Sequence, residues 1–553
     1  MAIVVGFGVS YFMMVRKSES VGASIPWSAY QAANGDGNAT IHGPSRKYLT
    51  PEAESSGHRY VRLDADGDHV EFTVRRAANT IVLRYSIPDA PKGGGIAATL
   101  SLYVNGNLER KLPLTSRYSW IYGNFPWSND PEMGKPHHFF DEVHALIGEL
   151  SPGDVIRLQK DTSDTAPYYL VDLIDLEKIK PPLSQPANSL SVSSFGAKGD
   201  GSVDDSPALV KCIDAAKREK KSVWIPPGEY MLNGPRIHIG NVRICGAGMW
   251  HSSLTGSSPM FEGTGEAVEF SDLGIFGAID HRKDDSPDNA FNGNFGHGSM
   301  FRNLWIEHMK CGFWTTHGTD SMLVEGCRIR NTMADGLNFC DGTSHSVVRN
   351  CHLRNTGDDS LATWSPSERP SQEPCIGNSF LHNTIELPWL ANGIALYGGS
   401  DHLIAENKVE GAVFSGAGIL VSSGFKAIPF GGTIRVSNNT IMDAGSDCYI
   451  GDTVGGLWIH AKDSDITVPI SVFGLLITGS TYSAITVHGP KAVANLCLRD
   501  IEIKGAGEYG IDIKPGVSGA LRASGLRISD TQLDPIRNGS PEKFHLSVED
   551  PVK

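Results

Sequence analysis

The sequence lacks the cysteine patterns that hold zinc ions or iron–sulfur clusters. Its nine cysteines include no Cys-x-x-Cys pair and no cluster with histidines at metal-ligand spacing. Cys327 and Cys351 are 24 residues apart at equivalent positions of a repeat, so we expect inward-facing thiols there and do not predict a disulfide. No metal centre is predicted, and the odd number of cysteines does not indicate a cellular compartment.

Positive charge is also scarce. Lys and Arg number 48 against 62 Asp and Glu, which gives a net charge of −14. This balance argues against a nucleic-acid partner and against binding to an anionic membrane surface. A neutral or cationic ligand is easier to accommodate.

Long apolar runs are missing, since none reaches the roughly 20 residues that a membrane span needs. The apolar run at residues 2–15 is followed by Arg16 and Lys17, and it resembles the core of a signal peptide. It has no basic segment before it and no clear cleavage site. We treat residues 1–24 as a signal-like or anchor segment, and we expect a secreted protein without a stable membrane span.

Residues 25–180 are predicted to form an antiparallel β-sandwich. Short alternating strands at residues 58–63, 70–74, 80–85 and 99–107 are separated by turn residues at regular spacing. Asn105-Gly106 is a strong hairpin signal because both positions tolerate positive φ. The proline-rich residues 181–190 are then predicted to be a linker.

Residues 191–553 are predicted to form a right-handed parallel β-helix, so the whole chain is expected to be all-β. The domain opens with a Gly- and Asp-rich turn and a helix at residues 207–218, with Ser206 as its N-cap and Asp204-Asp205 beside the cap. Such a helix can cover the first coil of a solenoid. Coils are then recognised by a polar or small residue before an apolar strand, at positions 311, 335, 359, 392 and 417. The third interval, from position 359 to position 392, is longer than the others, and we expect an inserted loop there at residues 366–374.

Three carboxylates fall on neighbouring coils of this repeat. Asp335 follows Asn331-Thr332, and the doublet Asp358-Asp359 follows Asn355-Thr356 with the same 24-residue interval. Equivalent residues of stacked coils lie roughly 4.8 Å apart, the spacing of neighbouring strands. Crowded carboxyls cannot all ionise freely, so at least one should have a raised pKa. A protonated acid beside an ionised base is what glycoside hydrolysis requires.

The opening of the second domain resembles the N-terminal cap of β-helix enzymes of the pectate-lyase-like superfamily. A β-sandwich followed by such a β-helix, with Asp-Gly and Asp-Asp motifs one coil apart, resembles glycoside hydrolase family 87, the bacterial α-1,3-glucanases (mutanases) and mycodextranases. The resemblance implies an extracellular, inverting endo-hydrolase of α-glucan such as mutan or nigeran, with no required metal. It also implies that Asp335, Asp358 and Asp359 are the catalytic residues. By analogy with polygalacturonases we assign Asp358 as general acid and expect Asp335 and Asp359 to hold the water. An exchange of roles between Asp358 and Asp359 stays open.

Three other functions are weighed against this one. Polygalacturonases share the acidic pattern, but their Gly-His-Gly follows the acids, whereas residues 296–298 precede them here, and no Arg-Ile-Lys follows. A pectate-lyase mechanism would need a calcium cluster and an arginine base that we do not find. The other class is a non-catalytic polysaccharide-binding solenoid, which would not need three acids on two coils.

Aromatic side chains near the acids are candidates for contact with sugar rings. Our predicted substrate-binding residues are Trp364 and Tyr397, which fall in one column of adjacent coils, together with Trp389 and His345. Aromatics in the sandwich at residues 118–127 could bind polysaccharide or pack against the solenoid. We expect a monomer, and a structural calcium is conceivable although no motif shows it.

Overall fold

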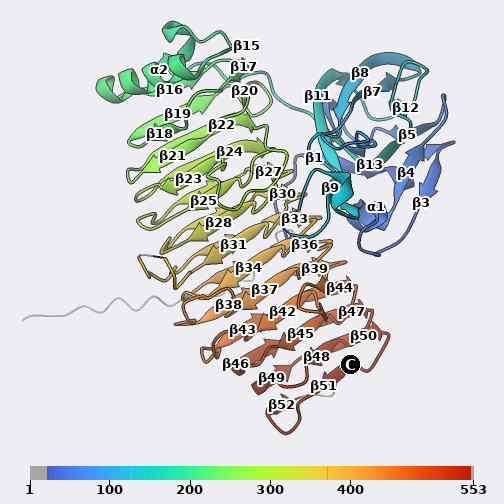
Figure 1. Ribbon diagram of the computed structural model, residues 1–553, viewed down its shortest axis with the longest axis vertical. Helices are drawn as coiled ribbons and strands as arrows, with labels where there is room; N and C mark the ends of the chain where they lie inside the picture. The colour runs from blue at the N-terminus through green and yellow to red at the C-terminus, as the bar shows by residue number, and fades with distance from the viewer. Residues whose placement is uncertain (1–20, 126, 370, 550–553) are drawn as a thin grey trace, which may run out of the picture.

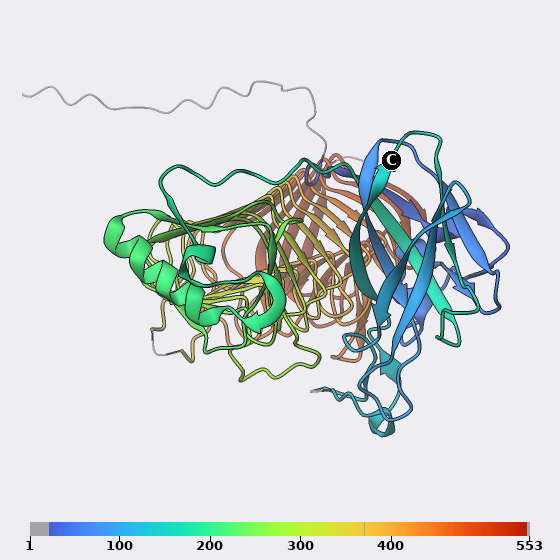
Figure 2. The same ribbon diagram turned by 90° about the horizontal axis from the view of Figure 1, so that it is seen from above.

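The computed structural model describes residues 21–125, 127–369 and 371–549 (Figure 1). It shows an antiparallel β-sandwich lying beside a long right-handed parallel β-helix, which confirms the predicted fold class (Figures 1 and 2). The predicted signal-like segment lies almost wholly outside the described residues. In the part of the chain that is described, no helix combines the length and the apolar character needed to cross a membrane.

The sandwich consists of two antiparallel sheets around one apolar core. The first has the order β11-β6-β13-β4-β3 with β1 beside β13, and the second has the order β2-β5-β12-β7-β8. The predicted hairpin is confirmed, because β7 and β8 pair around Asn105-Gly106, both with positive φ. The strands of the first sheet are β1 (Trp27–Gln31), β3 (Thr40–His42), β4 (Tyr60–Leu63), β6 (Ala78–Ser86), β11 (Asp141–Leu150) and β13 (Tyr169–Glu177). Those of the second are β2 (Asp36–Gly37), β5 (His69–Thr73), β7 (Ala97–Val104), β8 (Asn107–Thr115) and β12 (Val155–Gln159).

A helix covers the first coils of the solenoid, as predicted. Helix α2 (Ser206–Glu219) lies at the end of the solenoid in Figure 1 and buries its apolar side against the first strands. The predicted cap is wrong in detail, since Ser206 is the first helical residue and Asp205 precedes it as N-cap. Asp204 accepts the Ser206 amide at 3.0 Å, whereas Asp205 accepts the amides of Lys198 and Gly199.

Each coil around the acids contributes three short strands, one to each face of the solenoid. One face contains β26 (Leu323–Glu325), β29 (Val347–Arg349) and β32 (Ser379–Leu381), and the next contains β27 (Arg328–Arg330), β30 (His352–Arg354) and β33 (Thr384–Glu386). The third face is a 12-stranded parallel sheet that includes β25 (Phe313–Thr315), β28 (Leu337–Cys340), β31 (Leu361–Trp364), β34 (Ile394–Tyr397), β37 (Ile419–Ser422) and β42 (Leu457–His460). Its register places Phe313, Leu337, Leu361, Ile394 and Ile419 in one row, which confirms the predicted coil positions.

The interior is a continuous stack of apolar side chains. Cys327 and Cys351 are free and buried in it, and the Cys327 amide approaches the Cys351 sulfur at 3.4 Å. The thiol ladder is therefore present as expected.

The sandwich packs against the second face of the solenoid through buried charges. Arg354 donates to Glu142 at 2.5 Å and to Asp175 at 2.7 Å, and Arg330 donates to Glu142 at 3.0 Å. All four side chains are almost completely buried. Removing one partner from such a network leaves an uncompensated charge, so these contacts fix how the two domains meet.

The repeated Asn-Thr motif before the acids lies at this interface. Asn355 donates to Asn331 of the previous coil at 2.8 Å and to the Phe140 carbonyl at 2.8 Å. Arg84 of β6 donates to the Asn355 side chain at 3.0 Å. Sandwich contacts therefore hold the two turns that lead directly into the acidic residues.

Candidate active site

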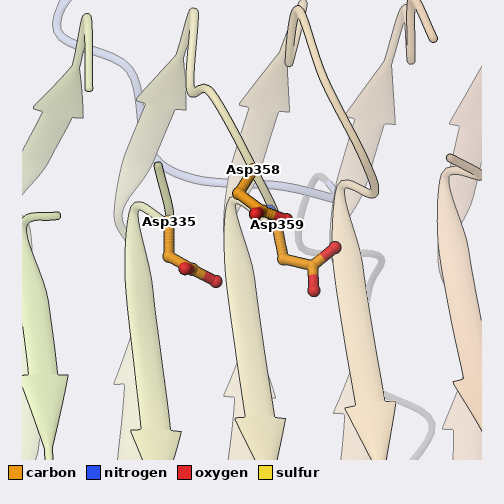
Figure 3. A group of neighbouring side chains, drawn as sticks. All are labelled: Asp335, Asp358 and Asp359. Atoms are coloured by element: carbon orange, nitrogen blue, oxygen red, sulfur yellow. The ribbon is translucent and has the colours of Figure 1, made fainter. Parts of the chain in front are cut away.

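The three predicted acids converge at the starts of two neighbouring strands. Asp335 precedes β28, and Asp358 and Asp359 precede β31, which pairs with β28 in parallel. One carboxylate oxygen from each residue lies within 4.8 Å of the others, and Figure 3 shows the three side chains on the same side of the sheet. The 24-residue period therefore does bring these groups together.

Asp359 is buried and strongly hydrogen-bonded. Its Oδ1 accepts the Asn392 amide at 3.0 Å and the Asn392 side chain at 2.7 Å. Burial, with a further contribution from the charge of Asp358, raises the pKa of Asp359 to about 7, although hydrogen bonds from Asn392 and Tyr397 oppose the rise. A carboxyl in this state keeps its proton close to neutral pH.

Asp335 is also buried, and its pKa lies well above the usual range. Burial is the main cause, the charges of Asp358 and Asp359 add to it, and Arg282 opposes it. Asn338 of β28 donates to Asp335 Oδ1 at 3.3 Å. Two of the three acids are therefore held in surroundings that favour the protonated form.

Asp358 has a different environment. Its side chain is 26% exposed, and one of its oxygens lies 2.7 Å from the Arg282 guanidinium. Arg282 also donates to the Gly357 carbonyl at 3.1 Å. Burial works against the charge of Arg282, but Asp358 and Asp284 outweigh it and raise the Arg282 pKa. The most exposed acid is thus the one paired with a cation.

Arg282 is a residue of the candidate site that the sequence did not indicate. The residue lies in the connection between β22 (Val268–Phe276) and β23 (Phe291–Asn294), two coils before Asp335, and it follows no period of the repeat. Lys310 donates to the Asp284 carbonyl at 3.2 Å and also to Ser286, which ties this connection to the coils. No sequence signal distinguishes this arginine from an ordinary loop residue.

One of the predicted sugar contacts, Tyr397, reaches the acids, and a second, Trp364, lies beside Tyr397 on the neighbouring strand. Trp364 and Tyr397 are register partners at the ends of β31 and β34, as predicted. Tyr397 is almost fully buried, and its hydroxyl hydrogen-bonds Asp359. Trp364 is half-buried and donates to the Phe425 carbonyl at 3.2 Å. Tyr397 therefore positions an acid, and only Trp364 keeps part of its ring accessible.

Trp389 lies behind the turn that leads into Asp358, since its amide donates to the Thr356 carbonyl at 3.0 Å, whereas His345 lies elsewhere. Trp389 is buried at the domain interface, stacked on His138 with 4.5 Å between ring centres and 6.0 Å from Trp127. Its ring faces are taken by the sandwich, so it packs the two domains together. His345 is bound to Asp320 at 2.6 Å in a turn beyond the far end of β28 from Asp335. The ring of Trp389 is thus covered by the sandwich, and His345 lies away from the acids.

The acidic trio is also the one group of three clustered His, Cys, Asp or Glu ligands among the described residues. Oxygen ligands of this kind suit hard cations such as Ca²⁺ or Mg²⁺. A cation there would compete with Arg282, which already supplies positive charge to Asp358. As protein groups alone, the trio combines two carboxyls whose surroundings favour the protonated form with a third that is paired with a cation, and acid–base cleavage of a glycosidic bond uses such unlike carboxyls within one site.

Known proteins with a similar sequence and fold indicate the family of this chain. The family model described as alpha-1,3-glucanase catalytic domain D1 matches residues 24–179, and the model for catalytic domain D2 matches residues 203–523. The catalytic unit of a thermostable GH87 α-1,3-glucanase from Streptomyces thermodiastaticus strain HF3-3 is 33% identical, with a TM-score of 0.86, covering 95% of this chain and 96% of that one. The Agl-KA catalytic domain is 30% identical, with a TM-score of 0.89 and coverages of 97% and 100%.

Curated relatives match shorter stretches. Alginate lyase 7 from Azotobacter vinelandii is 40% identical over 84 residues, which are 12% of this chain and 10% of that protein. The chain spans between 10% and 15% of the length of the curated relatives that it matches. The matches to both catalytic-domain models and to the solved structures extend over nearly the whole chain, so the chain belongs to glycoside hydrolase family 87, the family of the α-1,3-glucanases.

Proposed function

We propose that this protein is a secreted, endo-acting hydrolase that cleaves α-1,3-glucosidic bonds of α-glucan with Asp335, Asp358 and Asp359. The observation that carries the proposal is the convergence of the three carboxylates, two of them with raised pKa, within 4.8 Å. Family membership favours this function over the polygalacturonase and the non-catalytic alternatives.

The spacing of the acids gives independent support. Solved structures of another GH87 α-1,3-glucanase contain nigerose or tetrasaccharides, and three of its variants each have one aspartate replaced by alanine. Two of the replaced positions follow the third by 23 and 24 residues. Asp358 and Asp359 follow Asp335 by the same 23 and 24 residues.

We assign Asp358 as the general acid because it is the most exposed of the three and can reach the oxygen of a bound glycosidic bond. Asp335 and Asp359, on neighbouring strands, would hold the attacking water. The exchange of roles between Asp358 and Asp359 is the second candidate, favoured by the Asp359 pKa of about 7 and by Arg282 beside Asp358. Substrates with an activated leaving group distinguish the two assignments, because their cleavage needs no general acid. The Asp→Asn variant that retains activity on such substrates identifies the residue that acts as general acid.

We also propose inversion at the anomeric carbon, as the family resemblance implies. The acid oxygens approach within 4.8 Å, which is nearer to the roughly 5–5.5 Å of retaining pairs than to the roughly 6.5–9.5 Å of inverting ones. Anomer-resolved NMR of the first products is therefore a demanding test. Inversion yields β-anomers from α-linkages, and early α-anomers would contradict the proposal.

The substrate is tested by incubating purified protein with α-1,3-glucan, nigeran and polygalacturonate and measuring reducing sugar. We expect release from α-1,3-glucan, a rapid fall in chain length that marks endo cleavage, and none from polygalacturonate. Cleavage of polygalacturonate alone would contradict the assignment. The Asp358→Asn protein serves as the control for contaminating activity.

A further inference from the structure

Exposed aromatic side chains are rare in this protein and gather near the acids. Among the described residues, three aromatic side chains are about half exposed or more: Phe125 at 58%, Phe425 at 48% and Tyr449 at 54%. Exposing large apolar groups to water is unfavourable. A group of them beside a candidate site therefore indicates a binding surface. Sugar rings present apolar C–H faces that can cover such groups.

Phe425 lies one side chain away from Asp359. Tyr397, whose hydroxyl bonds Asp359, contacts Phe425 edge to face with 5.3 Å between ring centres. Tyr449 continues this surface 6.4 Å from Phe425, at the turn between β40 (Ser446–Cys448) and β41 (Asp452–Val454). The Lys462 ammonium lies 5.0 Å from the Phe425 ring centre and 5.6 Å from that of Tyr449, and it links the two rings.

The backbone around Phe425 is held in an unfavourable conformation. Phe425 and Lys426 both have positive φ, 55° and 52°, which bulky side chains rarely adopt. The Trp364 indole donates to the Phe425 carbonyl, and the Ser367 amide donates to the Lys426 carbonyl at 2.9 Å. Ser367 belongs to the inserted loop after the acidic doublet, so this loop holds the exposed ring in place.

Phe125 lies one side chain away from Asp358, and it comes from the sandwich. The Arg282 guanidinium that bonds Asp358 lies 5.6 Å from the Phe125 ring centre and 5.8 Å from that of Trp127. Arg282 also bonds Gly357, ahead of β31, whereas Phe425 is bonded by Trp364 at the end of β31. The contacts thus run from Phe125 through Arg282 to Asp358, and from Asp359 through Tyr397 to Phe425, so the two exposed rings reach the acids through different partners.

We propose that Phe125 of the sandwich and the Phe425–Tyr449 pair of the β-helix are two sugar-binding platforms that hold α-1,3-glucan on either side of the acids. The inference rests on the proposed function and specifies which residues bind the chain. It makes the sandwich a part of the substrate site.

The test uses the full chain with Phe125→Ala, Phe425→Ala and Tyr449→Ala, and Leu533→Ala as control, since Leu533 is 49% exposed on a distant coil. Each platform variant is expected to raise KM for α-1,3-linked oligosaccharides roughly tenfold while kcat changes little, because a contact present in both ground and transition state is lost. Phe425→Trp should restore KM, which a merely structural role would not predict. All variants should unfold at the wild-type temperature.

Calorimetric binding of an α-1,3-linked glucotetraose to Asp358→Asn, with and without each platform substitution, does not depend on turnover. Weakened binding in the platform variants supports the inference. Unchanged binding and KM in all three, while the wild type hydrolyses α-1,3-glucan, would overturn the inference and leave the proposed function intact. Absence of hydrolysis by the wild type, with aromatic-dependent binding, would overturn the proposed function alone.

Discussion

At the scale of single residues, the site depends on burial that opposes ionisation. Asp335 and Asp359 are both nearly inaccessible to water. The charge of Asp358 adds to the cost of ionising each of them, and the charge of Asp359 adds to the cost of ionising Asp335. Asn392 limits this effect by donating two hydrogen bonds to one Asp359 oxygen. Burying these acids therefore lowers the stability of the fold, and it lets them keep a proton near neutral pH.

Replacing Asp359 with Asn should stabilise the protein above pH 7 and have little effect near pH 4. The folded-state pKa is raised, so the contribution of Asp359 to stability is fully present below its unfolded pKa of 3.8 and is lost as pH rises through about 7. A pKa rise of this size corresponds to a loss of about 4 kcal/mol of folding free energy at most, because the neighbouring acids contribute to the same rise. Denaturant unfolding at pH 4.5 and pH 8 measures the difference. An equal effect of the substitution at both pH values would contradict the raised pKa.

Arg282→Ala should lower kcat roughly 100-fold with a smaller change in KM, because Asp358 loses the partner that orients it. Arg282→Lys keeps the charge but not the paired donors to Asp358 and Gly357, so it should recover only part of the rate. Steady-state kinetics on α-1,3-glucan oligosaccharides measure both. A wild-type kcat in Arg282→Ala would remove Arg282 from the mechanism.

At the scale of elements, the repeat explains why three acids meet. Strands β28 and β31 are parallel neighbours in exact register, so residues at the same position of the two coils lie side by side. The preceding Asn331 and Asn355 bond each other across the coils and meet the sandwich through Arg84 and Phe140. The position of the acids thus depends on both domains.

Arg354→Ala should destabilise the protein by about 3–5 kcal/mol, since Glu142 and Asp175 would remain buried without their main partner. Arg349, on the exposed side of the previous strand and paired with Glu325, provides the matched control, and its replacement should cost less than about 1 kcal/mol. Denaturant unfolding of the two variants gives the comparison. Equal losses would show that the buried pair does not hold the interface.

The coil register, the sandwich hairpin and the meeting of the acids could be predicted because each depends on local pattern or on a fixed period. Arg282 could not be predicted, because it reaches Asp358 from an irregular connection. Trp389 was predicted to contact sugar, but the sandwich covers its ring. The packing of one domain on another leaves no periodic signal in the sequence. Tyr397 was found in the right column, but the direction of its hydroxyl depends on side-chain packing.

At the scale of the whole molecule, both domains contribute residues to the candidate site. The sandwich supplies Arg84 behind the acidic turns and Phe125 beside Arg282, whereas the β-helix supplies the acids. The two family models, matched to residues 24–179 and 203–523, are both described as catalytic domains, in agreement with this arrangement.

Metal removal should leave hydrolysis unchanged, because the proposed mechanism uses only protein acids and Arg282. The test compares initial rates before and after prolonged dialysis against EDTA, and again after adding Ca²⁺ or Mg²⁺. A rate that falls with EDTA and returns with one of these ions would assign the trio to a metal site.

The most direct test of the account is the rate of reducing-sugar release from α-1,3-glucan by Asp335→Asn, Asp358→Asn and Asp359→Asn. Each substitution removes an ionisable group but nearly preserves shape, so we expect kcat to fall by roughly 100-fold to 10,000-fold while the protein stays folded. Wild-type rates in all three folded variants would contradict the assignment of catalysis to these carboxylates.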